Sequence, residues 1–191
     1  MKILIIRLSS LGDIVQAAPA AKALKDHFKE AQIHWLVRKD FLHLAECNPS
    51  VDQIWSLERK TGFLALYRMF SLLKSENFTH VYDAHNNLRS NLLLFFFKFL
   101  IRPYWNSPKT IQRSKNRWRR FLFFKCRKPV FKMPFRGSQS FIEPLETWGV
   151  PTAMPPTPNL SFTDNNNYEL PDHFIALVPS AAWPNKRWPL D

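Results

Sequence analysis

The stretch RLSSLGDIV, at residues 7–15, brings together residue types that can hold and deprotonate a polar substrate. It follows the apolar run MKILII and overlaps the end of the buried strand that KILIIRL, residues 2–8, predicts. Ser9 and Ser10 offer hydroxyls, and Gly12, in a chain with only 4 glycines, predicts a tight turn and close approach of a ligand to the backbone. Asp13 then lies at or just inside the start of the next helix, where the helix terminus keeps a carboxylate ionised and able to accept a proton. We therefore consider Asp13 a candidate general base.

Asp13 also has a structural interpretation, which is compatible with the first. A carboxylate in the first turn of a helix caps free amides there and contributes about 0.5–2 kcal/mol to the helix. Two other chemistries are excluded at this turn. The chain has no G-x-G-x-x-G or G-x-x-x-x-G-K-[ST] phosphate cradle and no G-x-S-x-G nucleophile turn.

A second polar group follows the strand that the run HVYDA predicts over residues 80–84. His85, Asn86 and Arg89 come directly after it and are candidates for holding hydroxyls or carboxylates of a substrate. The carboxyl ends of parallel strands meet at one edge of a sheet, so this group is expected beside the first turn. The alternative is that the turn only caps the next helix, with Asp83 ordering it.

Short apolar runs alternate with helical patterns through the first 100 residues, which predicts an α/β fold with an open, mostly parallel, Rossmann-like sheet. Strands are expected over residues 2–8, 32–37, 52–57 and 80–84, and helices over residues 18–28, 40–47, 62–74 and 88–100.

The pattern blurs between residues 102 and 136, although residues 116–125 predict a helix with a basic face. Residues 137–150 predict a helix that is interrupted at Pro144 and stopped by Gly149. We therefore expect one α/β domain over residues 1–150.

Four prolines in residues 151–158 predict a linker, which we extend over residues 151–172. Residues 173–191 read as the first strand and loop of a second α/β unit. One strand and a loop bury no core of their own, so we expect a truncated second domain here.

The formal net charge of +12 predicts an anionic partner: a nucleic acid, a phosphorylated small molecule or an acidic membrane face. Residues 98–136 hold a large share of the Lys and Arg and no Asp or Glu. The 2 cysteines are far apart and have no metal-ligand spacing, which favours a reducing compartment and no metal. The longest apolar run, residues 92–101, is too short to cross a bilayer and reads as a buried helix or one that partly faces a membrane surface.

Three stretches together resemble the lipopolysaccharide heptosyltransferases, glycosyltransferases of family 9 that use ADP-heptose. They are KILIIRLSSLGDIVQAAPAAKALK, HVYDAHNNLRSNLL and IALVPSAAWPNKRWP, in which the S-S-x-G-D turn and K-R-W-P are the most specific parts. The resemblance implies a GT-B architecture, in which an amino-terminal α/β domain holds the acceptor sugar and a carboxyl-terminal domain holds the nucleotide sugar. This chain then contains the first domain and the start of the second.

The resemblance also implies the chemistry: inverting transfer of heptose from ADP-heptose to the inner core of lipopolysaccharide, in the cytoplasm and peripheral to the inner membrane. Asp13 becomes the catalytic base, and Lys186 reaches the donor phosphates, helped by Ser180 and Arg187. The implied partners are the nucleotide sugar, an acidic glycolipid acceptor, an anionic membrane surface and a separate carboxyl-terminal domain; no further cofactor is implied. The acceptor side is assigned to Ser9, Ser10, Gly12, His85, Asn86 and Arg89.

Two alternatives remain open. The chain alone could be an acceptor-binding fragment without catalysis, because the adenosine contacts are implied for the missing domain. Aromatic residues interleaved with Arg in RWRRFLFF, residues 117–124, would also suit a nucleic-acid-binding module. No nucleic-acid-binding motif accompanies that stretch, so specific nucleic-acid binding is not expected.

Overall fold

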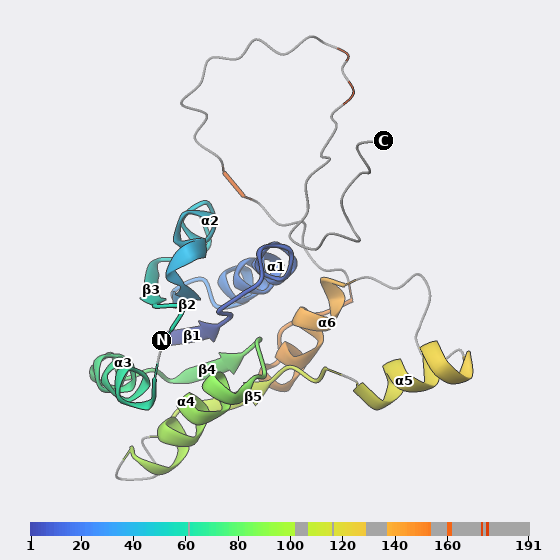
Figure 1. Cartoon of the computed structure of the whole chain (residues 1–191). Helices are drawn as coiled ribbons and strands as arrows, with labels where there is room; N and C mark the ends of the chain where they lie inside the picture. Colours follow the sequence, from blue (N-terminus) through green and yellow to red (C-terminus); the bar gives the residue numbers. More distant parts are fainter. Residues whose placement is uncertain are drawn as a thin grey trace.

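The computed structural model describes residues 1–60, 62–101, 107–115, 117–128, 137–153, 160–161, 173 and 175 (Figure 1). Five parallel strands form one sheet in the order β3-β2-β1-β4-β5. They are β1 (Lys2–Ile6), β2 (Gln32–Arg38), β3 (Gln53–Leu57), β4 (His80–Asp83) and β5 (Lys109–Gln112). The expected open, parallel α/β sheet is confirmed.

The helices fall where the sequence predicts them, with one earlier start. They are α1 (Leu11–His27), α2 (Leu42–Glu46), α3 (Phe63–Ser75), α4 (Leu88–Phe99), α5 (Arg117–Cys126) and α6 (Gln139–Ile142), with 3₁₀ turns η1 (Lys39–Phe41) and η3 (Glu143–Trp148). Helix α1 begins at Leu11 because Ser10 forms a capping box with Asp13. The interruption at Pro144 is confirmed by the change from α6 to η3, and Gly149 ends η3 with a φ of 83°.

Alternate residues of the buried strands face two different hydrophobic clusters. Ile3 and Ile5 of β1 pack with residues of α1, α2 and α6, whereas Leu4 and Ile6 pack with residues of α3 and α4. The sheet is therefore the middle of three layers, with α1, α2 and α6 on one face and α3 and α4 on the other (Figure 1). Because helices cover both faces of the sheet, nearly every side chain of β1 and β2 is buried, which explains why these strands are mostly apolar.

Strand β5 is a correction to the sequence prediction, which gave no strand between residues 102 and 136. It pairs with β4 alone, from His80 with Lys109 to Asp83 with Gln112, and its side chains are half-buried or exposed. A four-residue strand at the sheet's edge needs no apolar run, so the periodicity of KTIQ does not reveal it.

Strand order reverses between β1 and β4, because the chain first adds β2 and β3 on one side of β1 and then β4 and β5 on the other. Such a reversal leaves a crevice at the carboxyl ends of the two central strands, where open α/β sheets bind ligands. The expected second α/β unit, residues 173–191, lies outside the described residues apart from 173 and 175. In the described part of the chain, no helix is long and apolar enough to span a bilayer.

Candidate functional site

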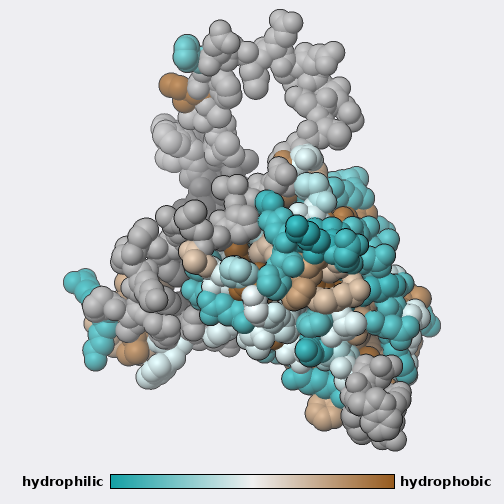
Figure 2. Space-filling view, turned by 180° about the vertical axis from the view of Figure 1, so that it is seen from behind, coloured by the Kyte–Doolittle hydropathy of each residue, from teal (hydrophilic) through white to brown (hydrophobic). Residues whose placement is uncertain are grey.

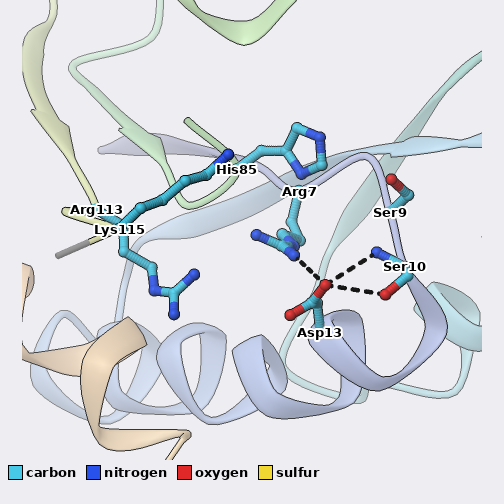
Figure 3. A pocket seen from close by; sticks show the side chains of 7 residues that line it. All are labelled: Arg7, Ser9, Ser10, Asp13, His85, Arg113 and Lys115. Atoms are coloured by element: carbon cyan, nitrogen blue, oxygen red, sulfur yellow. Dashed lines mark hydrogen bonds and ion pairs between the residues drawn. The ribbon is translucent and has the colours of Figure 1, made fainter. Parts of the chain in front are cut away.

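A pocket of about 330 Å³ lies at the carboxyl ends of β1, β4 and β5 (Figure 3). Its lining comes from the segments that follow these three strands: Arg7, Ser9, Ser10 and Asp13 after β1, His85 after β4, and Arg113 and Lys115 after β5. The size suits a sugar or another small polar ligand.

Asp13 is held on one of its two oxygens. The Oδ2 atom lies 2.6 Å from Nη2 of Arg7 and accepts hydrogen bonds from the Ser10 hydroxyl at 2.9 Å and the Ser10 amide at 3.4 Å. Among the described residues, Oδ1 has no hydrogen-bond partner, and Figure 3 draws every contact of Asp13 to the same oxygen. One oxygen therefore fixes the carboxylate, and the other is available to a ligand.

The cap and the ion pair thus use Oδ2 alone, and the predicted basic role of Asp13 would use the other oxygen, Oδ1. The first-turn interpretation is confirmed by the capping box with Ser10. Burial opposes ionisation of Asp13, but the charge of Arg7 and the hydrogen bonds from Ser10 outweigh it and lower the pKa of the carboxyl. Asp13 is therefore ionised at neutral pH, and its side chain is still 41% exposed.

Arg7 is the buried cation beneath the pocket. Its Nη1 donates to the carbonyl of Ala84 at 2.8 Å, and its guanidinium lies 5.2 Å from the centre of the Phe141 ring. Burial lowers the pKa of Arg7, while Asp13 acts against that shift, and an arginine stays charged in either case. Arg7 thus joins the ends of β1 and β4 and orients Asp13.

His85 is a neutral member of the lining. Burial, followed by the charge of Arg7, lowers the pKa of His85 to about 4. Its Nδ1 atom is buried and has no hydrogen-bond partner among the described residues. At neutral pH the imidazole can therefore donate or accept a hydrogen bond but adds no charge to the pocket.

Arg113 closes the pocket from the side of β5. Its Nη2 donates to the hydroxyl of Ser140 at 2.8 Å, and its guanidinium lies 3.8 Å from the centre of the Phe141 ring. Arg7 and Arg113 thus share one aromatic ring of α6 as a support. The lining carries three cations, Arg7, Arg113 and Lys115, against the single carboxylate of Asp13, which favours a ligand with an anionic group.

The structure brings together four of the sequence-predicted site residues: Ser9, Ser10, Asp13 and His85. Asn86 and Arg89 do not line this pocket. The Asn86 side chain donates to the carbonyl of Arg113 at 2.8 Å, and Arg89 donates to the carbonyl of Arg59 at 3.0 Å. Both contacts hold neighbouring loops, and an acceptor role for these two residues stays a prediction.

Gly12 lies inside α1, exposed, and not in a turn. A Cβ atom built on it would meet no atom within 4 Å, so the fold itself does not require glycine there. The tight-turn expectation is therefore wrong, because the turn is made by residues before Leu11. Close approach of a ligand to the bare backbone at Gly12 stays a prediction.

The turn after β4 is ordered by Asp83, as its structural interpretation predicts. Its Oδ1 accepts from the amides of His85 and Asn86, at 2.9 and 2.8 Å, and its Oδ2 accepts from the Ser90 hydroxyl and the Gln112 amide, both at 2.8 Å. Asn87 then caps α4. Asp83 thereby places His85 at the pocket.

The predicted donor-side residues, Ser180, Lys186 and Arg187, lie outside the described residues. Arg7, Arg113 and Lys115 are pocket residues that were not singled out from the sequence. Arg7 belongs to the stretch RLSSLGD, and Arg113 and Lys115 lie within the Lys- and Arg-rich residues 98–136, so charge was the signal that could have found them. No group of three or more potential metal ligands occurs within the described ranges.

No family model matches the chain. Curated proteins similar in sequence include lipopolysaccharide heptosyltransferase 1 of Campylobacter coli, 32% identical over 94 residues, or 49% of this chain and 28% of that protein. Another is the lipopolysaccharide core heptosyltransferase OpsX of Haemophilus influenzae, 23% identical over 96% of this chain and 52% of its own length. The chain thus spans about half or less of the length of these relatives.

Solved structures share the fold. The glycosyl transferase family 9 structure from Veillonella parvula superposes with a TM-score of 0.71 and 19% identity over 98% of this chain and 56% of that one. The E. coli heptosyltransferase WaaC with ADP gives a TM-score of 0.56 and 17% identity over 80% of this chain and 49% of that one. The fold is therefore that of family 9 glycosyltransferases over about half of their length.

The resemblance to the lipopolysaccharide heptosyltransferases that the sequence predicts is also confirmed. The relatives found by sequence are lipopolysaccharide heptosyltransferases, and the solved neighbours include heptosyltransferases of the same glycosyltransferase class. Ser9, Ser10 and Asp13 of the S-S-x-G-D motif that suggested the resemblance form one wall of the pocket.

Proposed function

We propose that this chain is the acceptor-binding part of an inverting glycosyltransferase that moves heptose from ADP-heptose to the inner core of lipopolysaccharide. The observation that carries the proposal is the arrangement of Asp13, fixed through Oδ2 and open at Oδ1 in a cationic pocket at the reversal of strand order. The names of the sequence relatives, which are heptosyltransferases of lipopolysaccharide, support the same reaction.

In this reaction the acceptor hydroxyl donates a hydrogen bond to Oδ1 of Asp13. Its proton passes to Oδ1 while the hydroxyl oxygen attacks the anomeric carbon of the heptose from the face opposite the diphosphate. The bond between that carbon and the phosphate oxygen breaks, and ADP leaves with the bonding electrons. A general base contributes about 10²–10⁴ in rate to such a step.

The cations of the pocket have a separate task. Arg113 and Lys115, with Arg7 beneath them, supply positive charge for carboxylate or phosphate groups of an acidic glycolipid acceptor. Ser9, Ser10 and His85 supply neutral hydrogen-bonding groups around the same space. Charge on the acceptor thus determines its orientation, and Asp13 receives the hydroxyl.

The donor side is assigned to Lys186, Ser180 and Arg187, which would offset the charge that gathers on the leaving diphosphate. Solved structures of E. coli heptosyltransferase WaaC contain ADP or ADP-2-deoxy-2-fluoro heptose, which supports ADP-heptose as the donor. We place the reaction at the cytoplasmic face of the inner membrane, where the acceptor glycolipid would be anchored, with no cofactor besides the donor.

The test is transfer from ADP-heptose to a Kdo-lipid A acceptor, followed by mass spectrometry of the glycolipid. The chain is assayed alone and together with the carboxyl-terminal domain of a full-length relative, with UDP-glucose as the control donor. We expect heptose addition with ADP-heptose only. Acceptor binding without transfer under both conditions would favour the non-catalytic fragment, and absence of acceptor binding would contradict the proposal.

A further inference from the structure

Helix α5 carries large apolar side chains that face solvent. Trp118 is 71% exposed and Phe124 is 72% exposed, and Phe121 between them is 48% exposed. Figure 1 shows α5 standing away from the sheet and from the other helices. In the reverse view of Figure 2, this projecting end of the molecule shows hydrophobic and hydrophilic residues side by side.

The three aromatic residues share one side of the helix. They recur at intervals of three residues, which places them within about a third of the circumference of an α-helix. The rings of Trp118 and Phe121 stack with their centres 5.5 Å apart. The result is a continuous apolar strip of the kind that lies in the interface of a bilayer.

The charge around this strip is of one sign. Residues 98–136 contain 13 of the 27 Lys and Arg of the chain and none of its 15 Asp and Glu. Lys125, Arg127 and Lys128, at and beyond the end of α5, are exposed. Long basic side chains beside an apolar strip can reach lipid phosphates while the aromatic rings enter the acyl region.

The position of α5 along the chain connects it to the pocket. Strand β5 ends at Gln112, Arg113 and Lys115 line the pocket, and α5 begins at Arg117. A helix held in the membrane surface would therefore bring the cationic side of the pocket to the level of the lipid head groups.

We propose that α5 docks in the plane of an anionic lipid bilayer, with Trp118, Phe121 and Phe124 inserted and Lys125, Arg127 and Lys128 on lipid phosphates. The helix acts as an anchor that presents the pocket to a membrane-bound acceptor. This role rests on the proposed function for its purpose, but the docking itself requires neither donor nor acceptor.

The test is co-sedimentation of the full chain with phosphatidylcholine vesicles that contain or lack 30% phosphatidylglycerol. The vesicles hold no glycolipid acceptor, so the result is independent of heptose transfer. We expect the chain to bind the anionic vesicles at least tenfold more tightly than the neutral ones. The double variant Trp118→Ser with Phe124→Ser is expected to lose at least tenfold in binding to the anionic vesicles.

The matched control is Phe63→Ser with Leu64→Ser, which removes apolar residues of similar exposure, 64% and 60%, from α3. This control is expected to bind vesicles like the unchanged chain, and circular dichroism verifies that both variants are folded. Equal loss in both variants, or unchanged binding in the α5 variant, would overturn the proposal. Binding of single-stranded RNA in place of vesicles would also overturn the proposal. The same holds if the chain forms a dimer in vesicle-free solution and the α5 variant abolishes that dimer.

Discussion

The guanidinium of Arg7 meets Asp13 on a single oxygen, with 2.6 Å between Nη2 and Oδ2. This ion pair connects the end of β1 with the first turn of α1 and leaves the second carboxylate oxygen facing the pocket. The proposed base is therefore already oriented toward the pocket.

The first prediction concerns acid stability. Because the folded protein lowers the pKa of Asp13, the ionised carboxylate stabilises the fold above the ordinary aspartate range, near pH 4, and this contribution is lost as pH falls through the lowered pKa. Asp13→Asn is expected to cost about 1–2 kcal/mol at pH 7 and much less at pH 2.5. Urea unfolding at the two pH values measures the difference. A loss that is equal at both would contradict the ion pair.

Asp26→Asn is the control for this measurement. Asp26 lies on the same helix and pairs with Lys22 on the surface, with 2.9 Å between Nζ and Oδ2. Such an exposed pair is worth about 0.3–0.5 kcal/mol, so the control is expected to change little.

A second prediction follows from Gly12. A methyl group there meets no atom of the chain, so Gly12→Ala is expected to stabilise α1 by up to about 1 kcal/mol. If an acceptor approaches the backbone at this point, the same change weakens acceptor binding at least tenfold. Thermal unfolding and acceptor titration measure the two effects on one sample. A variant that binds the acceptor normally would exclude Gly12 from the site.

The third prediction is that His85 stays neutral down to a pH of about 4, because burial and the charge of Arg7 lower its pKa to that value. An unfolded histidine takes up its proton near pH 6.5, so the contribution of His85 to stability is complete above that pH and is lost toward pH 4. NMR titration of the imidazole signals, with His85→Gln to assign the resonance, measures the pKa. Titration near 6.5 would place His85 in solvent.

The fourth prediction concerns Asp83, whose two oxygens accept four hydrogen bonds from the turn, from α4 and from β5. Asp83→Asn replaces an accepting oxygen by an amide donor, so we expect a loss of about 2–3 kcal/mol. Chemical denaturation measures it, with Asp40→Asn, a more exposed partner of Arg38, as the control. An equal effect of the two substitutions would show that the turn does not depend on Asp83.

Much of this fold follows from sequence periodicity. The strands β1 to β4 each contain a short apolar run, and the helices between them have an apolar stripe, so their order along the chain and their parallel direction are predictable. Strand β5 is not predictable in this way. It is defined by backbone pairing with β4 at the edge of the sheet, and its sequence has no apolar run. The change from α6 to η3 was predictable because Pro144 and Gly149 are specific local signals.

The site was predictable in part, for a similar reason. Asp13 and His85 are found because they follow apolar runs, and the reversal of strand order brings such positions together. Arg113 reaches the pocket only through β5, and its position on the Phe141 ring depends on α6, which is distant in sequence. Such contacts between distant segments leave no local pattern in a single sequence.

Heptose transfer from ADP-heptose to Kdo-lipid A, with the carboxyl-terminal domain of a full-length relative present, is compared between Asp13→Asn and Asp26→Asn. This comparison tests the role of Asp13 as the general base most directly. We expect Asp13→Asn to lower the transfer rate by about 10²–10⁴, because an amide cannot accept the proton, and Asp26→Asn to leave it unchanged. Acceptor binding is expected to persist in both. A transfer rate for Asp13→Asn within a few-fold of the unchanged chain would contradict the assignment of Asp13 as the base.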